Sequence, residues 1–332
     1  MSNKYDTLII GGGPAGLTAA KHLAYHRRRV LVIDRRSSPL YFITNPIHNY
    51  LCGQSAIEGR KLLQMFQEET KALGAIYCFA NVVRIEGTCP EFYVWTESKR
   101  GVEEYQGKTL LFATGVARKH PLVGGDWRKW LPYAGKKSIC FYCANCEAPE
   151  TAGKDILVVN VGTVRSALHV ARSIQRFAKR IRIFMTEDSS IPFTDADRQV
   201  LDQSEFEWMS GVIDRVEIKT PGQQQILITT DGQQVECQHF FASYMAVPRS
   251  ELAAQLGVAL TESGSIITDH RGKTNVEGIW AAGDVRAITQ QVAMAVGTGN
   301  YAAVMINQFL GFEDEPDMQV DQSDLRLVPH CF

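Results

Sequence analysis

Several features that narrow the function of a chain are missing from this sequence. It has no excess of either charge, with 35 basic and 36 acidic residues and a net charge of −1 over 332 residues. Binding to nucleic acid or to an acidic membrane surface is favoured by a basic face, so neither is indicated. No apolar stretch approaches the ~20 residues that a membrane-spanning helix needs. The composition therefore favours a globular protein that binds no nucleic acid, while peripheral contact with a membrane stays open.

The sequence also lacks the pattern of a secretory signal. Residues 1–6 are mostly polar, and the short apolar run that follows ends directly in three glycines. We therefore expect a cytoplasmic protein. Of the eight cysteines, five are scattered and three fall within seven residues, from Cys140 to Cys146. Because a chain of this length without a signal does not need structural disulfides, the cluster indicates catalysis or metal binding.

Two β-α-β units are present, and together they predict an α/β fold with two Rossmann-like dinucleotide-binding domains. Each unit shows a buried strand, a helix and a second buried strand within about thirty residues. The first consists of residues 7–10, 17–25 and 30–34, and the second of residues 156–159, 166–177 and 181–185.

A glycine-rich loop joins the first strand and helix of the first unit. Its pattern is G-x-G-x-x-G, and an acid ends the next strand. Glycines permit the tight turn and a close approach to a pyrophosphate, while the acid can accept bonds from a ribose. A dinucleotide site is predicted, with a purely structural turn as the alternative. The residues are Gly11, Gly13 and Gly16, with Pro14 and Ala15 between them, and Asp34.

The corresponding loop of the second unit departs from this pattern. Asn160 and Arg165 stand at the first and third glycine positions, and only Gly162 remains. We expect the Asn160 side chain to crowd the turn and Arg165 to obstruct helix–strand packing.

The end of the second strand of this unit argues against NADPH. Glu187 and Asp188 follow Thr186, where cations would be needed to hold a 2′-phosphate. NADH is less excluded, because an acid can bind a ribose diol. The cleft could also hold a different dinucleotide, with Arg165 and Arg182 near its pyrophosphate, or none. In that last case the domain only carries the cysteines.

The cysteine cluster contains two overlapping C-x-x-C patterns, formed by Cys140, Cys143 and Cys146. Structural zinc needs four ligands, and no second C-x-x-C or histidine pair occurs, so we expect no metal. A redox disulfide is predicted instead, with buried free thiols as the alternative. The spacing alone leaves open which pair is active.

Taken in order, these motifs resemble those of thioredoxin reductases, flavoproteins that pair FAD with a redox disulfide. Tyr-Cys-Ala-Asn-Cys-Glu, residues 142–147, is similar to the Cys-Ala-Thr-Cys-Asp of the low-molecular-weight enzymes. The resemblance implies FAD, with Asp284 on the ribityl chain and the next helix directed at the flavin. Further residues implied at the flavin are Asn49, Thr114, Gly115, Gly283, Gln291 and Val292.

The resemblance also implies roles for the cysteines. Cys143 and Cys146 form the disulfide, Cys146 lies nearer the flavin, and Cys143 meets the partner. Glu147 transfers a proton to or from the thiolate, and Cys140 is a buried neighbour. The chain departs from the family at residues 148–150, where the usual glycine and aromatic residues are replaced. That departure puts the partner-binding surface in doubt.

The implied architecture is a homodimer of thioredoxin reductase-like subunits in three segments. Residues 1–118 form the first part of the FAD domain, and residues 119–247 form an inserted C-x-x-C domain with a degenerate pyridine-nucleotide-type fold. Residues 248–332 form the second part of the FAD domain and the C-terminal tail. The expected partner is a thioredoxin-like protein or another dithiol or disulfide substrate.

The chain has the flavin and cysteine motifs but lacks the nicotinamide motifs. This combination resembles that of cyanobacterial diflavin-linked disulfide oxidoreductases. In that group a second FAD takes the nicotinamide space, and electrons run from dithiol to flavin. Two alternatives remain: an NADH- or ferredoxin-dependent thioredoxin reductase, and a flavin-bound redox sensor. The C-terminal residues 328–332 end in His330, Cys331 and Phe332, so they either cover a flavin or fray.

Overall fold

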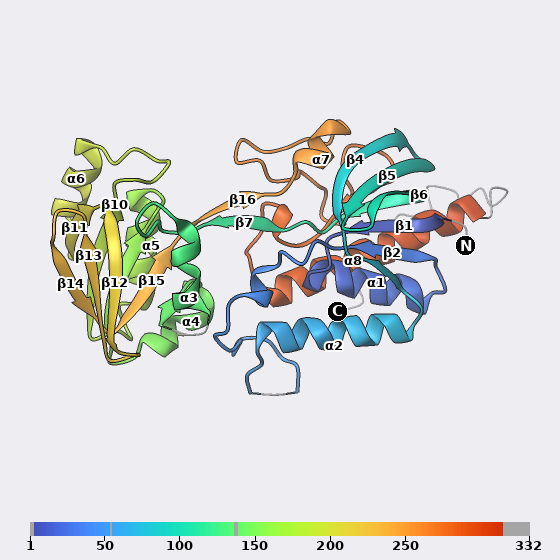
Figure 1. Ribbon diagram of the computed structural model, residues 1–332. Coiled ribbons are helices and arrows are strands. Elements are labelled where there is room, and N and C mark those ends of the chain that lie inside the picture. Colours follow the sequence, from blue (N-terminus) through green and yellow to red (C-terminus); the bar gives the residue numbers. More distant parts are fainter. Residues whose placement is uncertain (1–2, 54, 136–138, 315–332) are drawn as a thin grey trace, which may run out of the picture. The chain divides into compact units, whose positions relative to one another are not determined.

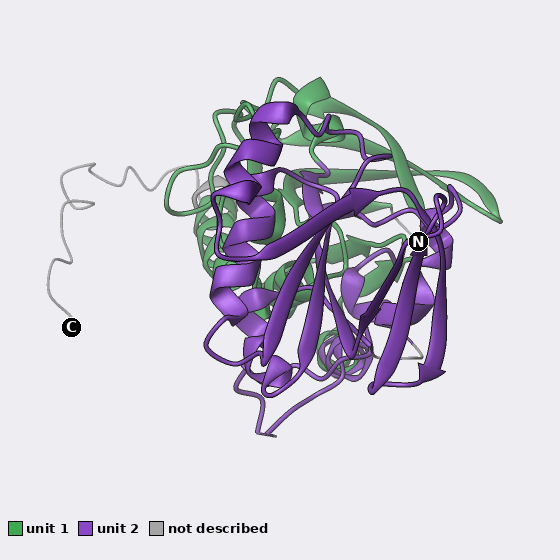
Figure 2. Ribbon diagram, turned by 90° about the vertical axis from the view of Figure 1, so that its left-hand side faces the viewer, with its two compact units in different colours: residues 1–35, 67–114, 250–332 green, residues 36–66, 115–249 purple. Residues whose placement is uncertain are grey.

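The computed structural model describes residues 3–53, 55–135 and 139–314. The chain forms two compact units, which Figure 2 distinguishes by colour. In the described part of the chain, the first comprises residues 3–35, 67–114 and 250–314, and the second residues 36–66 and 115–249. The second unit thus includes residues 36–66, which the sequence-based boundaries assign to the FAD domain. As functional domains, those boundaries stay a prediction.

The first unit is built on a seven-stranded sheet in the order β3-β2-β1-β6-β5-β4, with β17 also on β6 (Figure 1). The parallel strands are β1 to β3, β17 and the C-terminal half of β6, whereas β4, β5 and the N-terminal half of β6 form an antiparallel meander. The strands are β1 (Lys4–Ile10), β2 (Val30–Ile33), β3 (Ile76–Cys78), β4 (Asn81–Thr88), β5 (Glu91–Ser98), β6 (Gly101–Phe112) and β17 (Ile279–Ala281).

Both faces of the parallel part of this sheet are covered, which explains the apolar run of residues 8–10 at the end of β1. Leu8 and Ile10 enter one core and Ile9 the other, because successive side chains alternate between the faces. The Ile9 core includes α1 (Pro14–Tyr25) and α8 (Val292–Asp314), and the other core includes α7 (Glu251–Gln255). Helix α2 (Gly59–Ala72) crosses the boundary between the two units.

The second unit contains a five-stranded parallel sheet in the order β11-β10-β9-β15-β8. Leu157 and Val159 enter one core, and Ile156 and Val158 the other, against α5. The elements are β8 (Cys140–Phe141), β9 (Asp155–Asn160), α5 (Val164–Ile174), β10 (Arg180–Thr186), α6 (Asp195–Asp202), β11 (Glu207–Gly211) and β15 (His239–Ser243).

Two smaller sheets complete the second unit. The predicted meander is present as three antiparallel strands with its turn at Asp231 and Gly232, whereas the pairing of β7 with β16 was not anticipated. The remaining elements are β7 (Val116–Lys119), α3 (Leu131–Ala134), α4 (Ala144–Glu147), β12 (Ile213–Thr220), β13 (Gln224–Thr229), β14 (Gln234–Cys237) and β16 (Met245–Pro248).

The predicted α/β class, with a parallel sheet in each unit, is confirmed. Among the residues that the structure describes, no helix is both long and apolar enough to cross a bilayer.

Candidate active site

The first loop requires glycine at two positions, because a Cβ there would clash with the backbone. Gly11 has a φ of +112°, and a Cβ there would lie 2.3 Å from the Ala113 carbonyl oxygen. A Cβ on Gly16 would lie 1.9 Å from the Gly11 oxygen. Gly13 is the N-cap of α1, and a Cβ on it would meet no atom within 4 Å among the described residues beyond its chain neighbours. The loop is thus tightly packed underneath and open at the helix N-terminus, which suits a pyrophosphate.

The other predicted flavin residues of the first unit surround this loop. Asp34 is buried at the end of β2, against Gly12, and the Thr114 backbone nitrogen lies beside Gly11. Gly283 has a φ of +74°, and a Cβ there would lie 2.9 Å from the Ala15 Cβ. The structure therefore brings the loop, Asp34, Thr114 and the Gly283 turn together within one unit.

The remaining predicted flavin residues are more dispersed. Gln291 directly precedes α8 and Val292 begins it, in the first unit, and Asp284 follows Gly283. Asn49 and Gly115 belong to the second unit, where Asn49 is exposed in a bend. The assignment of all these residues to a flavin site stays a prediction.

The pair that the family resemblance implies is present as a Cys143–Cys146 disulfide. Cys143 is the N-cap of α4, so the short helix carries both sulfurs, and both residues are partly exposed. Cys140 is fully buried on β8 as a free thiol, as predicted. Burial, reinforced by the charge of Glu147, raises the pKa of the Cys140 thiol well above its ordinary value. The burial of Cys140 thus disfavours its thiolate, whereas Cys143 and Cys146 are joined in the disulfide.

Glu147 is buried and accepts three hydrogen bonds from N–H donors. The backbone nitrogens of Tyr142 and Cys143 lie 2.7 and 2.9 Å from Oε2, and Asn45 Nδ2 lies 2.7 Å from Oε1. Asn45 Nδ2 also lies 3.0 Å from the Cys140 carbonyl oxygen. Asn45 thus joins residues 36–66 to the disulfide segment, a contact that no local sequence pattern indicates.

The second nucleotide loop is closed by its own side chains. Asn160 is fully buried, and its Nδ2 donates to the carbonyl oxygens of Gly162, at 2.8 Å, and Thr163, at 3.3 Å. Ser166 Oγ donates to Asn160 Oδ1 at 3.0 Å. The side chain therefore stabilises the turn instead of crowding it, which corrects the sequence-based expectation for Asn160.

The expectation that Arg165 obstructs helix–strand packing is wrong. Arg165 is exposed on α5, whereas Ser166 faces the strand ends, with its Oγ also 3.2 Å from Ser243 Oγ. The helix begins four residues after the strand ends in both loops, at Pro14 and at Val164. That spacing gives Ser166 the position that Gly16 has in the first loop.

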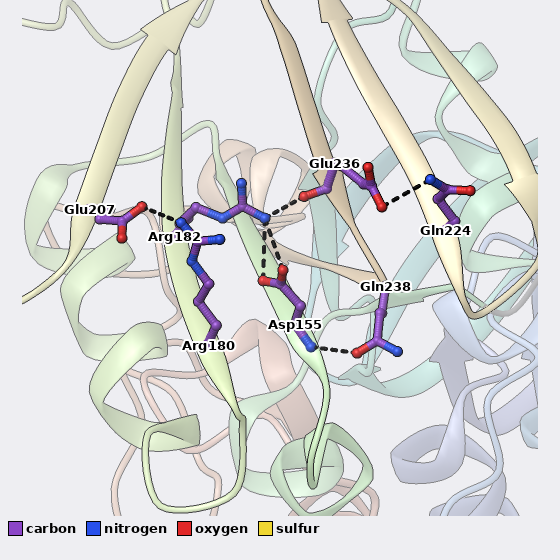
Figure 3. A network of polar contacts seen from close by, with 7 residues as sticks. All are labelled: Asp155, Arg180, Arg182, Glu207, Gln224, Glu236 and Gln238. Atoms are coloured by element: carbon purple, nitrogen blue, oxygen red, sulfur yellow. Dashed lines mark hydrogen bonds and ion pairs between the residues drawn. The ribbon is translucent and has the colours of Figure 1, made fainter.

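Arg182 lies in the N-terminal half of β10 and is held in a polar network, contrary to the sequence-based suggestion that it lies near a pyrophosphate. Its Nη2 lies 3.1 Å from an Asp155 carboxylate oxygen and also donates to the Glu236 carbonyl (Figure 3). Asp155 is fixed in turn, because its backbone N–H donates to Gln238. The network links β9, β10 and β14.

The acids that follow β10 differ in environment. Glu187 Oε1 accepts from Ser210 Oγ at 2.7 Å and from Arg198 at 3.4 Å. Arg198 also lies 3.9 Å from Asp195 and over the Phe193 ring. Burial raises the pKa of the Asp188 carboxyl. Arg198, the cation that contacts Glu187, is therefore already paired with carboxylates.

A cavity of about 690 Å³ lies within the second unit, at the carboxyl ends of β9 and β10. Its lining includes the cations Arg118, Lys119 and Arg249 and the aromatic residues His120 and Trp127. Ligands of α/β sheets bind at such strand ends, and ligand cavities commonly measure roughly 300–1,000 Å³. In the described part of the chain, no cluster of three or more His, Cys, Asp or Glu side chains is placed to hold a metal.

Comparison with known proteins identifies the family. Residues 5–299 match the model of the pyridine nucleotide-disulphide oxidoreductase family. The chain belongs to this family. It is 30% identical over 314 residues to the thioredoxin reductase of Bacillus subtilis, an alignment that covers 92% of this chain and 95% of the relative.

A solved thioredoxin reductase structure, from Streptococcus pyogenes, has a TM-score of 0.77 and 26% identity, over 94% of this chain and 99% of that one. A structure titled HlmI, with a TM-score of 0.78 and 24% identity, shows the shared fold alone. The protein is therefore a thioredoxin reductase-like, flavin-dependent disulfide oxidoreductase, and membership implies that it binds FAD. The predicted tail lid and Cys331 lie outside the described residues.

Proposed function

We propose that this oxidoreductase exchanges two electrons between a dithiol substrate and FAD through Cys143 and Cys146, independently of NADPH, and that the cavity of the second unit binds a second FAD. The observation that carries the proposal is the charge after β10, where Glu187 stands at the position that would meet a 2′-phosphate and is already paired with Arg198.

The first FAD is assigned to the first unit, whose geometry fits it. Gly13 leaves the α1 N-terminus open to a pyrophosphate, and Asp34 is placed at the strand end for a ribose. When bound, FAD supplies a two-electron acceptor or donor. The chain contributes the loop that holds the phosphates and the disulfide that meets the substrate.

The roles of the cysteines follow the resemblance. A substrate thiolate attacks Cys143, the S–S bond to Cys146 breaks, and a mixed disulfide forms with Cys146 as the leaving thiolate. The second substrate thiolate then attacks the substrate sulfur of the mixed disulfide. This step forms the disulfide of the oxidised substrate and releases Cys143 as a thiolate. The substrate has lost two electrons, and the cysteine pair has gained them. Glu147 holds the backbone of Cys143 in place and is the predicted proton carrier.

Independence from NADPH rests on charge. The position that would meet a 2′-phosphate carries Glu187, and the adjacent Arg198 is paired with that glutamate and lies near Asp195. A phosphate dianion would have to displace these carboxylates from Arg198 and then tolerate their repulsion. Thr186 offers no alternative, since its Oγ1 donates to the Asn160 carbonyl oxygen at 2.9 Å.

A second FAD suits the composition of the cavity. Three cations line it against the single carboxylate of Asp188, and Lys119 donates to the neutral Ser190 hydroxyl, which leaves its charge available to a pyrophosphate. The His120 and Trp127 rings are stacked, with centroids 6.0 Å apart, and offer an aromatic surface to a flavin or adenine.

A thioredoxin-like protein is the proposed partner, because the curated relatives carry the name thioredoxin reductase. The homodimer and the cytoplasmic location stay predictions. Two alternatives remain: an NADH- or ferredoxin-dependent reductase, and a redox sensor.

Anaerobic titration of the native flavin tests the proposal. We expect dithiothreitol to reduce the flavin, and NADPH and NADH to leave it oxidised over the same period. Rapid bleaching by NADPH would contradict the proposal, and bleaching by NADH or reduced ferredoxin alone would select the first alternative. Large redox-dependent changes in partner affinity with negligible turnover would select the sensor.

Substitution of single cysteines tests their roles. Cys146→Ser should prevent dithiol reduction of the flavin, whereas Cys52→Ser, which removes a free cysteine outside the pair, should leave it intact. Full flavin reduction by dithiols in Cys146→Ser would refute the assigned role.

A further inference from the structure

One hydrogen bond connects the cavity to the disulfide segment within the second unit. His120 lines the cavity, and its Nδ1 lies 2.9 Å from the Tyr142 hydroxyl oxygen. The two rings meet edge to face, with centroids 5.5 Å apart. Tyr142 directly precedes Cys143 in the chain. Two side chains in contact, those of His120 and Tyr142, therefore connect the cavity wall to the residue that precedes Cys143.

The pair is held in place from several sides. Trp127, which also lines the cavity, stacks on His120 at an interplanar angle of 17°. The Arg118 guanidinium lies 5.7 Å from the Tyr142 ring centroid and 4.6 Å from that of Tyr244. A ligand in the cavity can therefore contact His120 itself, or it can contact Arg118 or Trp127, each of which touches His120 or Tyr142.

Both partners of the hydrogen bond are neutral at neutral pH. Burial, with the nearby charge of Arg118, lowers the pKa of His120 to about 4. Burial raises the pKa of Tyr142 well above its ordinary value. A neutral imidazole carries its proton on one nitrogen only, and a hydrogen bond to the other nitrogen selects which one. A ligand bound to His120 Nε2 therefore decides whether Nδ1 accepts from Tyr142 or donates to it.

The Tyr142 main chain connects its ring to the disulfide segment. The Tyr142 and Cys143 N–H groups both donate to the same oxygen of Glu147, and Cys143 is the N-cap of α4, which carries Cys146. The Tyr142 ring is buried, so a shift of its hydroxyl must be taken up by its neighbours. The next residue along the chain is Cys143, whose N–H shares the Glu147 oxygen with that of Tyr142.

We propose that His120 and Tyr142 are positioning residues that make the reduction equilibrium of the Cys143–Cys146 disulfide depend on the ligand bound in the cavity. The inference rests on the proposed function, because it takes a flavin nucleotide as that ligand. In the linked reaction, the disulfide gains two electrons and two protons from a substrate dithiol, which becomes a disulfide. Cavity binding changes the equilibrium constant of that exchange and leaves its stoichiometry unchanged.

The test measures this constant in the full-length flavoprotein. The Cys143–Cys146 disulfide is equilibrated with dithiothreitol buffers, with FAD saturating the cavity and after the more weakly held FAD is removed by dialysis. In the wild type we expect FAD to shift the constant about fivefold, the effect of one net hydrogen bond of about 1 kcal/mol. In Tyr142→Phe, which removes only the hydroxyl, the shift should fall below twofold.

Two comparisons separate coupling from general damage. Tyr133→Phe removes a buried hydroxyl from the same core and should retain the fivefold shift. His120→Phe should lose the shift, and the double variant should show no further change, because both single substitutions remove the same link. A shift that survives in Tyr142→Phe, or is absent in a wild type that binds FAD in the cavity, would overturn the inference.

The outcome also separates this inference from the proposed function. If two FAD bind and NADPH is inactive while Tyr142→Phe keeps its shift, only the coupling is wrong. If the cavity takes no FAD, both the second flavin site and the coupling are refuted.

Discussion

Replacement of Glu147 by glutamine tests how the disulfide segment is held. The carboxylate accepts from two backbone N–H groups at one oxygen and from Asn45 at the other. Glutamine keeps the shape but has a single acceptor oxygen. If that oxygen accepts from the two backbone N–H groups, the new amide nitrogen faces Asn45 Nδ2. Two hydrogen-bond donors then face each other and neither has an acceptor there. Asn45 cannot simply turn over, because the same nitrogen donates to the Cys140 carbonyl.

The expected cost follows from these contacts. One buried donor loses its partner, at about 1–3 kcal/mol, and two backbone bonds lose the assistance of the negative charge. Together these effects should lower the stability of the segment by about 2–4 kcal/mol. A loss of 2 kcal/mol makes local opening about 30-fold more frequent.

Amide hydrogen exchange of the peptide that contains residues 139–148 measures this opening directly. We expect the Tyr142 and Cys143 amides to exchange at least 30-fold faster in Glu147→Gln, at about 1.4 kcal/mol per tenfold. Glu150→Gln is the matched control, because Glu150 is exposed and contacts His48 at 3.4 Å on the surface. It should change stability by less than about 0.5 kcal/mol.

A double-mutant cycle tests whether Asn45 Nδ2 is the donor that loses its acceptor in Glu147→Gln. Asn45→Ala removes it, so the combined Asn45→Ala and Glu147→Gln variant should be more stable than the sum of the single effects by about 1 kcal/mol. Unchanged exchange in Glu147→Gln, or strict additivity of the two substitutions, would refute the reasoning.

Three further substitutions have defined outcomes. Gly16→Ala places a Cβ 1.9 Å from the Gly11 oxygen and should abolish flavin binding, whereas Gly297→Ala, where no described residue beyond its own helix and chain neighbours lies within 4 Å, should retain it; equal flavin content in both would contradict the loop geometry. Arg182→Met leaves Asp155 without its guanidinium and should cost about 2–3 kcal/mol in urea unfolding, discounted for partial exposure; a change below about 0.5 kcal/mol would argue against the network. Burial lowers the pKa of His239 from 6.5 to about 4, so the unfolded chain binds more protons in this range and stability should fall by about 3 kcal/mol as the pH drops from 6.5 to 4. His239→Phe should flatten that slope, and an unchanged slope would exclude His239 as its cause.

Local patterns predicted what depends on neighbouring residues. The β-α-β units, the Asp231 turn and a redox disulfide within the cysteine cluster follow from spacing and residue type within short segments, and the family resemblance selected Cys143 and Cys146. Among the three cysteines, burial of Cys140 on β8 explains why it is not paired. These features could be read before any tertiary structure was known.

Contacts between distant segments could not be predicted in this way. Asn45 and Glu147 are 102 positions apart, and His120 and Tyr142 are 22 apart, with no periodicity that joins them. The error at Arg165 arose because glycine positions were matched by sequence alone. The strand end and helix start show that Ser166 takes the third position, and only the packed structure reveals that Asn160 bonds the turn that it was expected to disrupt.

The most direct test of the central claim is the number of FAD molecules released per chain when the purified protein is denatured. The account predicts two, one from the glycine loop of the first unit and one from the cavity of the second. One FAD per chain, together with rapid bleaching of the native flavin by NADPH, would contradict it and would make the second unit a nicotinamide site despite Asn160 and Glu187.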